Sequence, residues 1–174
     1  MAEQEILKMG NPILREIAEP IKEFNTPELS QLIEDMKDTM IANDGVGLAA
    51  IQIGILKRVI IFGFEESPRY PQSPAIPMTV LINPSFKSLE TESETGWEGC
   101  LSIPGMRGLV PRFKKIQYSG YDFLGKKITR EVSAFHARVF QHELDHLDGL
   151  LYIDKIENYA NFGFTQELES ANAY

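Results

Sequence analysis

His142, Glu143 and His146 are the residues whose types and spacing point most directly to chemistry. They form the pattern HExxH, and on an α-helix residues four apart lie on one face, one turn above each other. Two imidazoles so placed can bind one divalent metal ion, and the glutamate between them can exchange a proton with water there. A solvated helix face with two incidental histidines is the alternative. Because the chain has only three histidines and two of them have this spacing, we predict a metal site.

A catalytic metal needs a third protein ligand, and Cys100 is the best candidate. It is the only cysteine of the chain and lies in the sequence EGCLS. A thiolate with two imidazoles leaves one coordination position open, which is typical of a catalytic zinc-type site and not of a structural one. Taken alone, a single cysteine is more simply a small buried residue. The acidic residues downstream of the histidines, Asp154, Glu157 and Glu167, are the alternative third ligands.

A third segment, GVGLAAIQ at residues 45–52, combines small residues with one amide side chain, that of Gln52. Small residues allow a backbone to approach a ligand closely. The amide offers N–H donors that could stabilise an oxygen atom on which negative charge develops. Taken alone, the segment is more typical of a tight turn flanked by glycines.

Together, the three segments closely resemble the signature motifs of peptide deformylases. These read GφGφAAxQ, EGCφS and HEφDHφxG, where φ is an apolar residue, and the chain matches them at residues 45–52, 98–102 and 142–149. The resemblance extends over nearly the whole chain and includes NPILR at residues 11–15. HExxH alone is shared by many proteases, whereas the three motifs in this order are specific. The resemblance implies one catalytic domain over residues 1–174 that removes the formyl group from the N-terminal formylmethionine of newly made polypeptides and releases formate.

The resemblance also assigns the chemistry to particular residues. The implied metal ligands are Cys100, His142 and His146, the proton carrier is Glu143, and the donors to the developing oxyanion are the Gln52 amide and the Leu101 backbone N–H. A Cys-His-His set with an open position suits Zn²⁺, and Fe²⁺ is also compatible. The resemblance favours one Fe²⁺ per chain, for which Zn²⁺, Ni²⁺ or Co²⁺ can substitute.

Substrate binding is implied by the same correspondence. Val46, Phe135 and Val139 are expected to form the methionine pocket, Gly47 and Gly99 to lie where the peptide backbone pairs like an added strand, and Arg107 to contact the substrate. Two of the pocket residues, four apart on the motif helix, would look the same if they packed only in the core. An arginine just past the cysteine motif could equally be a surface residue.

Three further residues near the motifs receive structural interpretations. His136 is about 240° around the helix from the first motif histidine, so we expect it to face away from the metal. Asp145 is expected to pair with Arg112 or Arg138 and not to bind metal. Glu98 is expected to organise the cysteine loop by hydrogen bonding.

The composition sets the broad class of protein. The chain has 174 residues, 43% of them hydrophobic and 24% charged, which is ordinary for a globular protein of one domain. The net charge of −8 does not suggest a nucleic-acid partner, and no apolar run approaches the roughly 18 residues of a membrane span. One cysteine excludes an internal disulfide and fits a reducing compartment. The acidic N-terminus resembles neither a signal peptide nor a transit segment, so we expect the bacterial cytoplasm in preference to an organellar matrix. There the enzyme would meet nascent polypeptides at the ribosome.

Patterns of apolar residues, caps and turns predict an α+β fold in which antiparallel β-sheets surround a central metal-binding helix. The expected helices are residues 12–18, 27–43, 133–149 and 157–170; the expected strands are 58–64, 79–83, 85–94, 114–122 and 126–132; and residues 65–78 are expected to be a surface loop.

Two other functions compete with deformylation. A zincin-type metallopeptidase would cleave internal peptide bonds, take its third ligand from downstream and not need Cys100. A small metal-stabilised binding module would need a closed site with four ligands, and the chain has no obvious fourth member.

Overall fold

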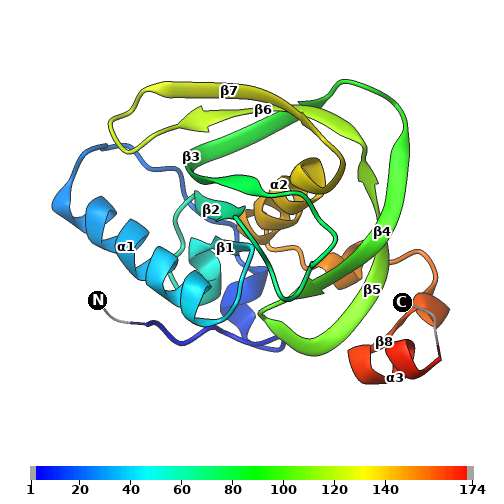
Figure 1. Cartoon of the computed structure of the whole chain (residues 1–174). Coiled ribbons are helices and arrows are strands. Elements are labelled where there is room, and N and C mark those ends of the chain that lie inside the picture. Colours follow the sequence, from blue (N-terminus) through cyan, green and yellow to red (C-terminus); the bar gives the residue numbers. More distant parts are fainter. Residues whose placement is uncertain (1–2, 172–174) are drawn as a thin grey trace.

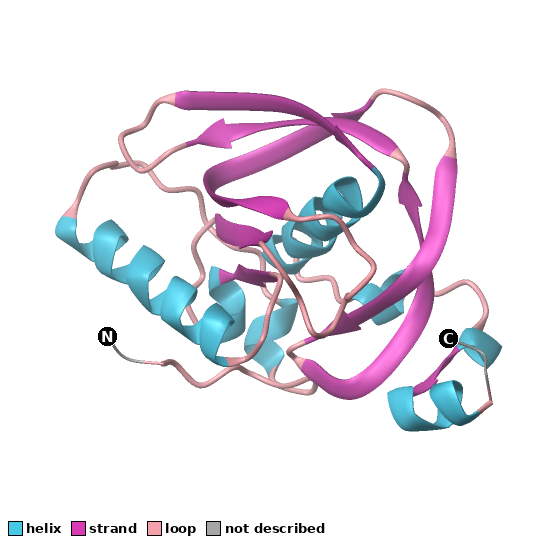
Figure 2. Cartoon of the chain, viewed as in Figure 1, coloured by secondary structure: helices cyan, strands magenta, loops and turns pink. Residues whose placement is uncertain are grey.

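Two antiparallel sheets surround one central helix in the computed structural model, which describes residues 3–171 (Figures 1 and 2). The five-stranded sheet has the order β1-β2-β3-β6-β7, and the three-stranded sheet has the order β4-β5-β8. The strands are β1 (Gly47–Ala49), β2 (Val59–Phe64), β3 (Ile76–Ser88), β4 (Ser93–Cys100), β5 (Ile103–Phe113), β6 (Lys115–Tyr121), β7 (Lys127–Ser133) and β8 (Phe162–Phe164). The helices are α1 (Pro27–Ala42), α2 (Ala134–Leu147) and α3 (Thr165–Ser170), with 3-10 turns η1 (Pro12–Arg15), η2 (Ala50–Ile53), η3 (Tyr152–Lys155) and η4 (Tyr159–Asn161). The predicted α+β fold around the motif helix is confirmed.

Helix α1 follows directly from its sequence. The Thr26 hydroxyl accepts a hydrogen bond from the Leu29 N–H, and Pro27 occupies the first helical turn, where its missing N–H costs nothing. Apolar residues three and four positions apart form the buried face. They are Leu29, Ile33, Met36 and Met40, and they pack in one cluster with Val59 and Ile61 of β2.

Helix α2 is almost entirely buried, because the five-stranded sheet covers one side of it and the three-stranded sheet lies along another (Figure 1). Its apolar side packs on β2 and β6, where the rings of Phe140 and Tyr118 stack with centroids 4.7 Å apart. The helix ends at Leu147, two residues before the predicted stop residue Gly149, which has φ of +72° and no room for a side chain, since a Cβ would lie 2.6 Å from the Arg15 carbonyl oxygen. Polar residues on such a helix must find partners inside the protein.

Strand β3 is one continuous strand where two were predicted. The predicted break lies at Pro84, and Asn83 just before it has φ of +50° and marks a shift in register toward β6. Its side chain accepts a hydrogen bond from the Ile21 N–H and donates one to the Ile21 carbonyl, so a local irregularity is absorbed without ending the strand. Strand β3 also begins at Ile76, inside the predicted loop.

Strands β4 and β5 were not predicted as a pair. Their sequences contain glycines, prolines and charged residues that disfavour strands. The pairing nevertheless runs from Ser93 opposite Phe113 to Cys100 opposite Ile103. Glycine has a specific function at Gly96, where a Cβ would lie 2.9 Å from the Arg138 guanidinium carbon. Tertiary packing therefore decides this pairing.

The predicted helix over residues 157–170 is wrong for most of its length. Only α3 is α-helical, residues Tyr159–Asn161 form the 3-10 turn η4, and β8 pairs with Met106, Arg107 and Gly108 of β5. Phe162 packs with Ile156 and Tyr152 in a small cluster that a helix would not allow. The short helix expected at residues 12–18 is likewise only the turn η1.

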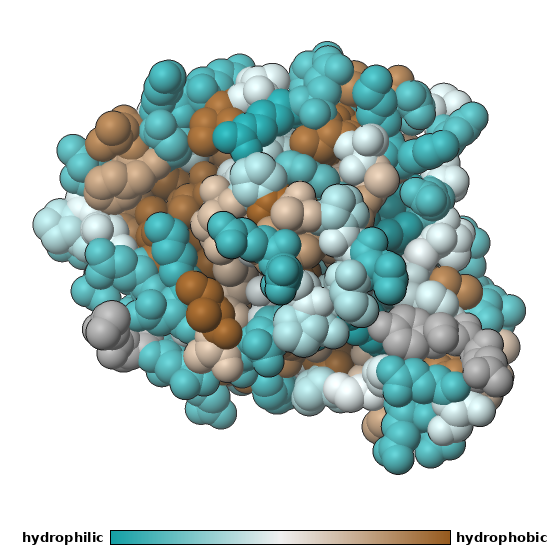
Figure 3. Space-filling model, viewed as in Figure 1, coloured by the Kyte–Doolittle hydropathy of each residue, from teal (hydrophilic) through white to brown (hydrophobic). Residues whose placement is uncertain are grey.

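Polar residues cover most of the face in Figure 3, and hydrophobic residues form separate patches on it. Within residues 3–171, no helix has the length and apolar character needed to cross a membrane.

Candidate active site

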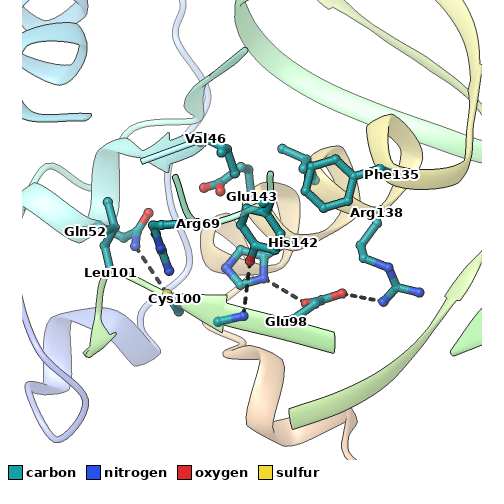
Figure 4. Close-up of a pocket in the computed structure, with 14 residues that line it drawn as sticks. Val46, Gln52, Arg69, Glu98, Cys100, Leu101, Phe135, Arg138, His142 and Glu143 are labelled. Atoms are coloured by element: carbon teal, nitrogen blue, oxygen red, sulfur yellow. Dashed lines mark hydrogen bonds and ion pairs between the residues drawn. The ribbon is translucent and has the colours of Figure 1, made fainter. Parts of the chain in front are cut away.

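Three separate segments meet at one pocket beside α2 (Figure 4). Helix α2 contributes His142 and Glu143, the end of β4 contributes Cys100, and η2 contributes Gln52. The residues lining the pocket are Val46, Gly47, Gln52, Arg69, Tyr70, Glu98, Gly99, Cys100, Leu101, Phe135, Arg138, Val139, His142 and Glu143. Residues distant in sequence therefore share one cavity, and ten of the twelve predicted site residues line it. The other two are His146 and Arg107.

The expected ligand set is assembled beside this pocket. One ligand atom from each of Cys100, His142 and His146 lies within 4.8 Å of the other two, and all three residues are buried. The Cys100 Sγ is 3.3 Å from the His146 Nε2. Of the downstream alternatives, Asp154 instead pairs with Arg15 and accepts a hydrogen bond from the Leu151 N–H. The geometry favours the cysteine as third ligand.

Glu98 orients the imidazole of His142 through a hydrogen bond to its Nδ1. Its Oε2 is 2.8 Å from the His142 Nδ1, and a carboxylate can only accept, so Nδ1 donates and Nε2 is left as the ligand atom. Arg112 donates to both carboxylate oxygens, at 2.8 and 2.9 Å, and Arg138 donates to Oε1 at 2.9 Å. Burial alone would raise the pKa of Glu98, but Arg112 and His142 outweigh it and hold the pKa well below its usual range. The hydrogen bonds of Glu98 thus hold the first motif histidine, and the expected role of Glu98 in organising the cysteine loop stays a prediction.

The surroundings of Cys100 favour its thiolate. Burial raises the pKa of the thiol, but the imidazoles of His146 and His142 have the larger combined effect and leave the pKa well below its ordinary value. The backbone N–H of Ser102 donates to Sγ at 3.4 Å, and the Gln52 Nε2 lies 3.6 Å from it. The thiolate is the form that binds metal.

Glu143 lies at the pocket, where burial outweighs the attraction of its carboxylate to the nearby imidazoles of His142 and His146. Burial raises its pKa to about 7, and its Oε2 has no hydrogen-bond partner among the described residues. Gly47 is essential to its position, because a Cβ there would lie 2.7 Å from the carboxyl carbon of Glu143. The missing side chain at residue 47 therefore makes space for the glutamate.

Aromatic and aliphatic residues form one wall of the pocket. Phe135 and Val139 extend from α2, and Val46 lies just before β1. The Tyr70 ring packs on Phe135 with centroids 4.8 Å apart, and its hydroxyl accepts a hydrogen bond from the Gly99 N–H at 3.4 Å. These residues give the pocket one apolar wall.

Arg69 and Tyr70 line the pocket, although they belong to residues 65–78, which were predicted to be a surface loop. Nothing in a polar, proline-rich segment distinguishes residues that turn inward. The predicted substrate contact Arg107 does not line the pocket; its guanidinium lies over the Tyr70 ring, 4.8 Å from the centroid, and donates to the Arg69 carbonyl. Arg107 thus contacts the segment that lines the pocket, and its contact with the substrate stays a prediction.

The two structural interpretations on α2 agree with the geometry. Asp145 pairs with Arg112, one of its two expected partners. His136 lies between the rings of Phe62 and Tyr118, away from the other histidines.

A buried cysteine and two buried histidines beside a pocket that contains a glutamate are the arrangement expected of a metal-dependent hydrolase. The sequence profile of the polypeptide deformylase family matches residues 3–161, and the chain belongs to that family. Peptide deformylase 1 of Bordetella pertussis is 55% identical over 163 residues, covering 94% of this chain and 93% of that protein.

Solved structures agree. The class I type b peptide deformylase from Acinetobacter baumannii, with Met-Ala-Ser bound, aligns with a TM-score of 0.86 at 38% identity, over 89% of this chain and 99% of that chain. The peptide deformylase from Thermotoga maritima aligns with a TM-score of 0.80 at 35% identity, over 91% of this chain and 100% of that chain. The chain is accordingly a metal-dependent enzyme that removes the formyl group from the N-terminus of newly made polypeptides.

Proposed function

We propose that residues 1–174 act as one catalytic domain in which Cys100, His142 and His146 bind Fe²⁺ and Glu143 carries the proton during deformylation. The observation that carries this proposal is the grouping of three buried ligand atoms within 4.8 Å of one another beside the pocket that contains Glu143. Such a grouping fits a site with one open position, and the glutamate lies next to it in sequence and in space.

The donor set fits a metal ion. It combines a thiolate favoured by its neighbours with two buried imidazoles, and Glu98 orients the first of these. Such a set suits both Zn²⁺ and Fe²⁺. The family resemblance favours Fe²⁺, with Ni²⁺, Co²⁺ or Zn²⁺ able to replace it. When bound, the ion would polarise the formyl carbonyl and lower the pKa of a water molecule toward neutrality.

Glu143 supplies the proton transfers. As the oxygen of water attacks the formyl carbon, the Glu143 carboxylate takes up the proton that water loses. The same proton then passes to the nitrogen as the C–N bond breaks, giving formate and a free amine. Glu143 suits both transfers because its side chain lines the pocket beside the ligand set and its Oε2 has no other hydrogen-bond partner among the described residues.

Two N–H donors stabilise the oxygen of the formyl group as charge develops on it. One is the Gln52 amide, whose NH₂ group faces Cys100 in Figure 4, and the other is the backbone N–H of Leu101. Both residues line the pocket beside the ligand set. Such donors act mainly in the transition state and therefore affect turnover more than binding.

The substrate enters with its methionine side chain among Val46, Phe135 and Val139, and its backbone beside Gly47 and Gly99. Met-Ala-Ser bound to the Acinetobacter relative supports a peptide that begins with methionine. We place the enzyme in the bacterial cytoplasm, acting on nascent polypeptides at the ribosome, and the bacterial relatives support this origin.

Formate release from formyl-Met-Ala-Ser, with metal analysis of the same sample, tests the proposal. We expect equal amounts of formate and free amine, with one metal ion per chain. Acetyl-Met-Ala-Ser is the matched control and should react far more slowly, because its extra methyl group lies at the reacting carbon.

Two outcomes would contradict the proposal. Cleavage of internal peptide bonds without formate would indicate the zincin-type alternative. Retention of full metal content and activity in Cys100→Ala would exclude this cysteine as the third ligand.

A further inference from the structure

The side-chain amide of Gln52 has one orientation. Its Oε1 accepts a hydrogen bond from the Ala49 backbone N–H at 2.9 Å, and both residues are buried. A backbone N–H can only donate, so its partner must be the amide oxygen. The NH₂ group therefore occupies the other arm of the planar amide, and the assignment of its two ends is not ambiguous.

This NH₂ group has two hydrogens and two neighbours. Its nitrogen is 3.1 Å from the Ser102 Oγ, a normal hydrogen bond, and 3.6 Å from the Cys100 Sγ, a longer contact to sulfur. Ser102 has no exposed surface and does not line the pocket. Its hydroxyl therefore takes one N–H of Gln52, and the second N–H faces the ligand set (Figure 4).

Backbone hydrogen bonds fix the distance between Ser102 and Gln52. The Ser102 carbonyl accepts from the Met9 N–H, and the Gln52 carbonyl accepts from the Leu7 N–H, each at 2.8 Å. The Ser102 N–H donates to the Cys100 Sγ. The N-terminal segment thus ties the two chain segments together, so the hydroxyl meets the amide at a set position.

We propose that Ser102 is a positioning residue for deformylation, whose hydroxyl holds one N–H of Gln52 so that the other stays directed at the formyl oxygen. This inference rests on the proposed function, in which Gln52 stabilises that oxygen. Without the hydroxyl, one N–H in a buried site loses its partner. The NH₂ group is then held only by the longer contact to the Cys100 Sγ, and its donor is no longer fixed in direction toward the substrate.

A double-mutant cycle between Ser102→Ala and Gln52→Leu tests the proposal. We expect Ser102→Ala alone to lower kcat about fivefold to tenfold, the effect of one lost hydrogen bond, with KM and metal content unchanged. In the Gln52→Leu background the same change should lower kcat less than about twofold, because the group that Ser102 positions is gone. An equal loss in both backgrounds, or loss of metal, would mean that Ser102 only supports the Cys100 loop.

Two further variants control for general effects on the fold. Ser93→Ala, at an exposed serine at the start of β4, should behave as the wild type. Ser102→Thr keeps the hydroxyl and should retain more of kcat than Ser102→Ala. If Ser102→Ala is not recovered as folded protein, Ser102→Cys replaces it in the cycle, since sulfur fills the space but accepts hydrogen bonds weakly.

The same measurements distinguish failure of the proposed deformylase function from failure of the roles of Gln52 and Ser102. Absence of formate release by the wild type would reject the proposed function. Formate release with an unchanged kcat in Gln52→Leu would reject the oxyanion role of Gln52, and the role of Ser102 with it. A large effect of Gln52→Leu with additive losses in the cycle would reject the role of Ser102 alone.

Discussion

The two buried carboxylates of the site, Glu98 and Glu143, are equally hidden from solvent but have opposite surroundings. Their exposed fractions are 3% and 4%. Glu98 accepts hydrogen bonds from Arg112, Arg138 and His142, whereas the Oε2 of Glu143 has no partner among the described residues. Cationic partners accordingly hold the pKa of Glu98 well below its usual range, while burial raises the pKa of Glu143 to about 7.

Glu98 and Glu143 are the same residue type and are equally buried, so their different roles in the site come from their neighbouring side chains. A carboxylate with cationic partners remains charged and can hold a histidine in one tautomer. A carboxyl group without such partners changes protonation near neutral pH and can carry a proton. A change in the surroundings of Glu98 should therefore impair the orientation of His142, and a change in those of Glu143 should impair proton transfer.

The largest effect is expected from Glu143→Gln. The amide has nearly the same shape but cannot take up a proton, so kcat should fall roughly 10²–10⁴-fold. Metal content should stay at the wild-type level, because Glu143 is not one of the ligands. Formate release and metal analysis on the same sample check both. If metal content fell in step with activity, Glu143 would belong to the ligand set.

Glu98→Gln, unlike Glu143→Gln, should lower metal affinity and stability. Metal affinity should fall about 10–100-fold, because His142 loses the partner that orients it. The free energy of unfolding should fall by about 3 kcal/mol, at the lower end for a broken buried ion pair, because Arg112 keeps Asp145. Competition with a chelator and denaturant unfolding measure the two effects.

Glu94→Gln is the matched control for this change, since Glu94 is an exposed residue of the same strand. It should alter neither metal affinity nor stability. Equal effects of the two substitutions would show that Glu98 has no special place in the site.

The residues of this comparison were only partly predictable from sequence. The pairing of the two histidines could be predicted, because an α-helix has 3.6 residues per turn and therefore places His142 and His146 on the same face. The role of Cys100 required the combination of motifs. Arg112 and Arg138 were expected to be partners of Asp145, but their contacts with Glu98 could not be predicted, since β4 and β5 have the composition of loops and pair through tertiary packing.

The loop residues show the same limit. Arg69 and Tyr70 belong to a polar segment with several prolines, and no spacing indicates which side chains turn inward. The C-terminal segment was predicted as a helix, but β8 pairs with β5 and Phe162 packs beneath it. Local propensity is overruled where a free strand edge and an apolar cluster are available.

A smaller effect is expected from Gly47→Ala, which changes the position of Glu143 without changing its chemistry. The new Cβ would lie 2.7 Å from the carboxyl carbon, so the side chain must move. Displacement of a catalytic group should lower kcat roughly tenfold or more while the metal remains bound.

Gly105→Ala is a control for the effect of adding a methyl group to a glycine: a Cβ there meets nothing within 4 Å, although its φ of +74° adds local strain. It should reduce stability without reducing kcat. Unchanged kcat in Gly47→Ala would mean that the position of the glutamate is not critical.

The smallest effect concerns the pH dependence of stability. Glu143 has its pKa raised from 4.5 to about 7 in the folded protein, so the folded state binds more protons than the unfolded state between these values. Stability is therefore lost as pH rises through this window, and Glu143→Gln removes the loss. In metal-free protein, the melting temperature of Glu143→Gln should exceed that of the wild type by several degrees at pH 7.5, with a difference that shrinks toward pH 4.5. The metal must be absent, because a cation beside the carboxyl group would favour its charged form. A difference that stayed constant from pH 4.5 to 7.5 would show that Glu143 has an ordinary pKa, and the contrast with Glu98 would then rest on hydrogen bonding alone.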